Sequence, residues 1–136
     1  MSFANSAALQ SAIYTQLSED SEVLDLVGGH IYDAMPSGDL PELFISLGAE
    51  VMHDKSDVTG IGTDHDLTLS VITTKAGFLP AKVLASAVGQ ALLGTLPDLE
   101  QGRIVFFNFI RATARRDTDS QTRRIDMLFR ARLADV

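Results

Sequence analysis

The chain has 136 residues and a hydrophobic fraction of 46%, which suits a globular domain with its own core and excludes a disordered chain. It contains no cysteine, which excludes disulfides, thiolate nucleophiles and cysteine zinc sites. The formal net charge of −7 is segregated, because residues 1–102 carry 3 basic and 14 acidic side chains whereas residues 103–136 carry 8 basic and 4 acidic ones.

The first part of the chain predicts two helices. Over residues 6–17, apolar side chains recur four positions apart, which is the stripe of an amphipathic helix. These side chains are Leu9, Ile13 and Leu17. A shorter helix is expected over residues 22–27, with Gly28 just beyond its end. Residues 30–32 are then expected to form a short extended segment.

The middle of the chain predicts a β-hairpin. Residues 43–52 and 66–72 alternate between two sets of side chains, as expected for strands with one buried face. In the first of these strands, Leu47 and Val51 are expected on the same face. The connection over residues 53–63 is long for a hairpin tip, and long tips tend to be functional or mobile.

A long helix and a second hairpin complete the predicted elements. The helix is expected over residues 79–93, because small and apolar residues repeat there at intervals of three and four. Residues 104–111 and 124–133 alternate as two strands, and polar residues 114–123 form the tip between them.

This order of elements predicts an α+β fold in which residues 1–136 form a single domain. Hairpins on either side of one long helix give a mostly antiparallel four-stranded sheet, with the helices packed on one face in a two-layer sandwich. The opposite face is expected to carry aromatic and apolar side chains. These are Phe44, Val105, Phe107 and Phe109. Because an exposed apolar patch usually marks an interface, we expect this face to bind a partner.

A cluster of histidines and aspartates is the strongest candidate for chemistry. His53, His65 and Asp66 flank the tip of the first hairpin, where imidazoles and carboxylates could bind a metal ion or supply a general base. The alternative is that they decorate an exposed loop, since successive strand residues point to opposite faces. We expect no catalytic residue, no metal site and no cofactor. A small metal-dependent enzyme or ligand-binding domain is the alternative from another functional class.

The arginines indicate docking to a partner. Arginine forms fixed, bidentate contacts with carboxylates and phosphates, and here it is used without lysine. The segregated charge favours a contact between the basic edge of one copy and the acidic face of the next, and such head-to-tail contacts can close into rings. The candidate interface residues are Arg111, Arg115, Arg116, Arg123, Arg124, Arg130 and Arg132, together with Phe44, Phe107 and Phe109. A solvated hairpin tip and direct contact with DNA are the alternatives.

Membranes and nonspecific nucleic-acid binding are not expected. No apolar run approaches the roughly 20 residues that span a bilayer, and Met1–Ser6 lacks the pattern of an export signal. The net negative charge opposes nonspecific attraction to phosphates, although the basic C-terminal quarter allows a local contact.

An ordered set of segments resembles the tail terminator, or tail completion, proteins of siphophages. The segments are Ala8–Leu17, Leu26–Asp33, Asp54–Asp57 with His65–Leu69, the Ala- and Val-rich helix, and Arg116–Arg123 before the last alternating strand. The chain is most similar to the version found in prophages and in the gene transfer agents of alphaproteobacteria. The likeness runs over about residues 8–133.

The resemblance implies a virion protein without enzymatic activity. Such proteins form a hexameric ring that caps the tail tube, stops its polymerisation and presents a surface to the head connector, while DNA passes through the lumen without specific binding. The implied partners are further copies of the chain, the tail tube protein and a head stopper or connector protein. The implied location is the tail or neck of a virion or phage-like particle that assembles in the bacterial cytoplasm. A head-side stopper or connector subunit is the alternative within the same class.

Overall fold

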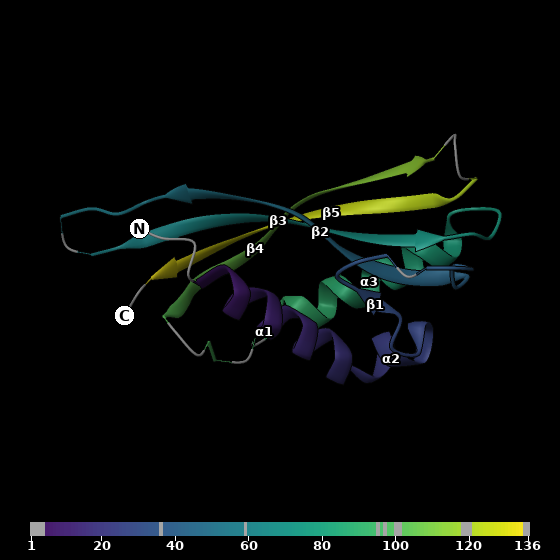
Figure 1. Ribbon diagram of the computed structural model, residues 1–136, viewed down its shortest axis with the longest axis horizontal. Helices are drawn as coiled ribbons and strands as arrows, with labels where there is room; N and C mark the ends of the chain where they lie inside the picture. The colour runs from purple at the N-terminus through teal and green to yellow at the C-terminus, as the bar shows by residue number, and fades with distance from the viewer. Residues whose placement is uncertain are drawn as a thin grey trace.

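The computed structural model describes residues 5–35, 37–58, 60–94, 96, 98–99, 102–117 and 121–134. Its helices are α1 (Asn5–Glu19), α2 (Ser21–Val27) and α3 (Leu79–Leu92), and its strands are β1 (Ile31–Tyr32), β2 (Leu43–Asp54), β3 (Gly62–Thr73), β4 (Arg103–Arg116) and β5 (Arg123–Ala134). The helices gather below one face of a long, twisted sheet (Figure 1).

The described strands form a five-stranded sheet in the order β1-β2-β3-β5-β4. β1 is parallel to β2, and every other neighbouring pair is antiparallel. The prediction of an α+β fold with a mostly antiparallel sheet is therefore confirmed. The prediction of four strands is wrong, because Ile31 and Tyr32 pair with Ile45 and Ser46 and add a short edge strand.

The two N-terminal helices follow their local signals closely. The predicted stripe of Leu9, Ile13 and Leu17 is buried on α1. The carboxylate of Asp20 caps α2 by accepting a hydrogen bond from the backbone N–H of Val23 at 3.0 Å, which satisfies one of the free donors at the helix start. Gly28 ends α2 with a φ of 58°, a left-handed conformation that glycine adopts without steric cost.

The hydrophobic core lies between the helices and the sheet. The helices contribute residues such as Leu17, Val23 and Leu84, and the facing strands contribute residues such as Ile45 and Phe129, all of them fully buried. Burying one such side chain stabilises the fold by about 1.5–3 kcal/mol. We call the sheet face against the helices the inner face and the opposite face the outer face.

A β-bulge in β2 changes which side chains reach each face. The pairing with β3 shifts between Leu47 and Glu50, so that Glu50 pairs with Leu67 on the inner face. A Cβ atom at Gly48 would lie 2.8 Å from the carbonyl oxygen of Thr68, so the close approach at the bulge requires glycine. The prediction that Val51 shares the face of Leu47 is wrong, because the one extra residue at the bulge turns Val51 to the outer face.

Both hairpins have longer strands and shorter tips than predicted. The pairing of β2 with β3 continues to Asp54 and Thr63, and that of β4 with β5 continues to Arg116 and Arg123. The tips are therefore residues 55–61 and 117–122, of which residues 59 and 118–120 lie outside the described part. The two tips lie at opposite ends of the sheet (Figure 1).

Candidate interaction surface

Two arginines of the predicted docking set form a ladder on the outer face. Arg130 binds Asp66 with its Nε and Nη2 atoms 2.7 and 3.0 Å from the two carboxylate oxygens. Arg132 binds Asp64 at the same two distances. The residues of each pair lie directly opposite one another on β5 and β3, which aligns the guanidinium with the carboxylate. The hydrogen bonds from these guanidinium groups hold the pKa of both aspartates below its usual range.

A second cluster surrounds Asp126 near the other end of the sheet. Its carboxylate accepts hydrogen bonds from Ser70 at 2.6 Å, Arg124 at 2.9 Å and Arg115 at 3.2 Å. Burial raises the pKa of Asp126, but these hydrogen bonds outweigh it and the pKa is lowered. Arg115 and Arg124 also pair with Asp117, at 2.7 and 3.6 Å.

Four of the seven candidate arginines are therefore occupied within the molecule. They are Arg115, Arg124, Arg130 and Arg132. Arg123 is partly engaged, because it donates a hydrogen bond to the carbonyl of Lys75 at 3.3 Å and lies over the ring of Phe78. Arg111 and Arg116 are exposed, and neither has an ion pair or side-chain hydrogen bond with the described residues. The charge available for docking on β4 is thus concentrated at these two positions.

The aromatic residues do not form the single outer patch predicted from the sequence. Phe107 stacks on Phe129 with 5.3 Å between ring centroids, and Phe109 meets the same ring edge-on at 5.7 Å, so both lie on the inner face. Phe44 does lie on the outer face, where it pairs with Ile72, but it is fully buried. The predicted placement is wrong because β4 contains two bulges that break its alternation. Phe109 remains 43% exposed and available for contact.

The buried residue His65 belongs to a polar cluster that the sequence did not reveal. Its Nδ1 atom lies 2.6 Å from a carboxylate oxygen of Glu50, and its Nε2 atom lies 2.9 Å from the hydroxyl of Thr63. The hydroxyl of Ser6, in α1, donates a hydrogen bond to the same carboxylate, whose two oxygens lie 2.8 and 2.7 Å away. Burial raises the pKa of Glu50, but the hydrogen bonds from His65 and Ser6 outweigh it and the pKa is lowered.

This cluster joins the first turn of α1 to β2 and β3. The predicted grouping of His65 with His53 and Asp66 does not form, because His65 points inward while Asp66 points outward to Arg130 and His53 is exposed. Within the described ranges, no group of three or more metal-binding side chains is placed to hold an ion. The glycine at position 48 was the only sign of this cluster in the sequence, because the bulge that forms there turns Glu50 toward α1.

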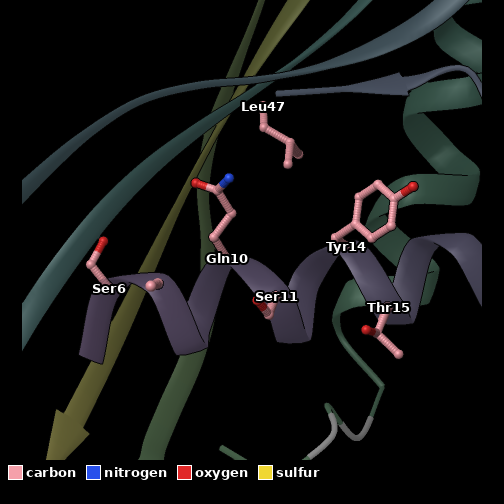
Figure 2. Close-up of a pocket in the computed structure, with 7 residues that line it drawn as sticks. Ser6, Gln10, Ser11, Tyr14, Thr15 and Leu47 are labelled. Carbon is pink, nitrogen blue, oxygen red and sulfur yellow. The ribbon is translucent and has the colours of Figure 1, made fainter. Parts of the chain in front are cut away.

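A groove of about 570 Å³ runs beside the polar cluster, between α1 and β2. Figure 2 shows Gln10 and Tyr14 rising from α1 toward Leu47, which descends from β2. A neighbouring hollow, lined by Gly48 and Glu50, continues the groove along the bulge. The lining combines apolar and hydrogen-bonding groups. No helix in the described part of the chain has the length and apolar character needed to cross a bilayer.

Comparison with known proteins shows similarity over nearly the full length of the chain. The family described as "Tail completion protein gp17" matches residues 11–134. A chain in the solved structure titled "Virion of native gene transfer agent (GTA) particle" is 48% identical, with 98% of this chain and 99% of that chain covered and a TM-score of 0.90. Comparison with curated proteins gave no significant match.

Proposed function

Because the chain belongs to the tail completion protein gp17 family, we propose that it is a ring-forming tail terminator of a phage-like particle. It is a structural component of the tail rather than an enzyme. In the proposed role, copies of the chain form a hexameric ring that caps the tail tube, stops its growth and joins it to the head connector. Its partners are then its own copies, the tail tube protein and the head connector.

One observation supports this proposal above the others. The similar chain in the gene transfer agent virion matches over 98% of this chain at 48% identity and a TM-score of 0.90. At that likeness the two chains share their fold over nearly the whole length of both. A particle component of the same fold is expected to occupy the same kind of position.

The charge distribution is consistent with contact between copies. Residues 1–102 have a net charge of −11 and residues 103–136 a net charge of +4. The ion pairs on the outer face neutralise several arginines, so we assign the main docking charge to Arg111 and Arg116 and an apolar contact to Phe109. Opposite charges on two copies favour their association and fix its orientation.

The net charge also suits a channel for DNA. A negatively charged ring repels phosphates, so DNA is expected to pass through the lumen without specific binding.

Particle assembly without this chain tests the proposed function. We expect tails of uncontrolled length that fail to join heads when the gene is deleted, and tails of normal length when it is supplied in trans. Tails of normal length that stay detached from heads would indicate a head-side connector instead. Normal tails joined to heads in the deletion strain would overturn the proposal.

A further inference from the structure

The sheet has two long edges that no described segment covers. β4 is an edge strand over all its 14 residues. β2 is the other edge beyond the short β1, which pairs only with Ile45 and Ser46, so its residues from Leu47 to Asp54 are open. Open edges present unpaired backbone N–H and C=O groups that can pair with another chain.

The pairing registers show which parts of the two edges lie at the same level. Following neighbours across β2, β3, β5 and β4 gives three rows: Asp54–Thr63–Leu133–Ile104, Glu50–Leu67–Phe129–Phe109, and Leu47–Leu69–Met127–Ala112. The open part of β2, residues 47–54, is therefore level with residues 104–112 of β4. β2 and β4 also run in opposite directions, because three antiparallel pairings separate them. A second copy in the same orientation would thus bring β4 antiparallel to the open β2 edge.

Both level segments carry exposed apolar side chains. On β4, Val105, Phe109 and Ile110 are 46%, 43% and 42% exposed. On the β2 side, Val51 is 54% exposed and Tyr14 borders the groove shown in Figure 2. Exposed large apolar side chains along an edge strand promote association when nothing covers them.

Opposite charges also lie at matching levels. Arg111 of β4 is level with Leu128 of β5 and, across it, with Thr68 of β3. Thr68 lies opposite the bulge in β2. Asp33 directly follows Tyr32, the last residue of β1. Tyr32 pairs with Ser46, and the open edge of β2 begins at the next residue, Leu47. Arg111 and Asp33 are both exposed, and neither side chain has an ion-pair partner among the described residues. A neighbouring copy would bring the two together.

We infer that residues 104–112 of β4 in one copy add as an antiparallel strand to the open edge of β2, residues 47–54, in the next copy, with Arg111 facing Asp33 of that copy. This inference rests on the proposed ring and assigns its contact surface. The contact is heterologous, because two different edges meet, and repetition around an axis closes it into a ring. Each sheet then continues into the next, and the open backbone groups of both edges are paired.

Engineered disulfides test the strand contact, because the natural chain has no cysteine. Val51 lies in one row with Asp66, Arg130 and Asn108, so Val51 of one copy is level with Asn108 of the next. Opposed residues in an antiparallel pair come close enough for a disulfide. We expect the double variant Val51→Cys/Asn108→Cys to give a ladder of cross-linked species up to a closed ring on non-reducing gels.

Matched variants separate this contact from chance collisions. Each single cysteine variant can give only dimers, and Val51→Cys/Leu79→Cys carries its second cysteine on an exposed position of α3. If native mass spectrometry shows rings but the ladder is no stronger than in these controls, the strand contact is wrong and the ring proposal stands. If no copies associate at any concentration and no ladder forms, both proposals fail.

A charge reversal gives an independent test of the orientation. We expect Arg111→Glu to weaken association at least tenfold at low salt, and the further change Asp33→Arg to restore it. Lys82→Glu changes the charge equally at an exposed site on α3 and is expected to leave association within twofold. Failure of Asp33→Arg to restore association in the Arg111→Glu background would overturn the proposed pairing.

Discussion

Replacing Glu50 with glutamine should reveal how strongly the buried polar cluster ties α1 to the sheet. The side chain of Glu50 is only 11% exposed, and its carboxylate contacts His65 at 2.6 Å and Ser6 at 2.8 and 2.7 Å. Glutamine retains one acceptor oxygen but loses the charge. Because hydrogen bonds to buried charged groups contribute about 1.5–3 kcal/mol, we expect Glu50→Gln to lower the free energy of unfolding by about 2 kcal/mol at pH 7. The melting temperature should fall by about 7 °C.

The pH dependence follows from the lowered pKa of Glu50. A carboxyl group with a lower pKa in the folded state contributes stability above its unfolded value, 4.5, and loses that contribution as the pH falls through the folded value. The stability difference between wild type and Glu50→Gln should therefore be full near pH 7 and should decrease as the pH falls below 4.5. Chemical denaturation at a series of pH values measures this difference.

An exposed glutamate provides the control. Glu19→Gln, at the end of α1, should change the free energy of unfolding by less than about 0.5 kcal/mol at every pH. A Glu50→Gln protein as stable as this control, or a difference from wild type that stays constant between pH 3 and 7, would refute the role given to the cluster.

Three further substitutions test other parts of the structure by thermal and chemical denaturation. Gly48→Ala should cost about 1–3 kcal/mol, because the new Cβ would lie 2.8 Å from a carbonyl oxygen of β3, whereas Gly60→Ala meets open space and should change little. Asp126→Asn should cost about 1–2 kcal/mol at pH 7, and this cost should shrink near pH 3, since the lowered pKa of Asp126 makes its contribution disappear in acid. Phe129→Ala should cost about 3–5 kcal/mol, because its fully buried ring contacts two further phenylalanines on β4.

Much of the fold could be predicted because local pattern and tertiary packing agree. The stripe of Leu9, Ile13 and Leu17 is the buried side of α1, and the regular alternation from Ile125 to Leu133 is the inner face of β5. In these two segments, the side chains that recur at the helical or strand period all face the hydrophobic core. The positions of the apolar residues in the sequence therefore coincide with the buried positions in the structure.

The faces of β2 and β4 could not be predicted, because bulges interrupt both strands. Alternation identifies a face only while pairing is regular, and an extra residue exchanges the two faces beyond it. This exchange moved Val51 outward, Glu50 inward, and Phe107 and Phe109 to the side of the helices. Gly48 was the local sign of one bulge, but a glycine in a strand does not show how many residues are displaced.

The pairing of the arginines depended on the order of the strands. Arg130 and Arg132 meet Asp66 and Asp64 only because β3 lies beside β5, with α3 and β4 between them in the sequence. The segregated charge of the sequence is therefore partly neutralised within one molecule. The sequence could indicate which residues carry charge, whereas the sheet order decides which of them remain free for a partner.

The proposed terminator ring is tested most directly by electron cryo-microscopy of the assembled particle, with this chain located in the density. We expect a single hexameric ring between the tail tube and the head connector, with β4 of each copy beside the open edge of β2 in its neighbour. Copies spread along the tube, or a chain absent from the junction of tail and head, would contradict the proposed function.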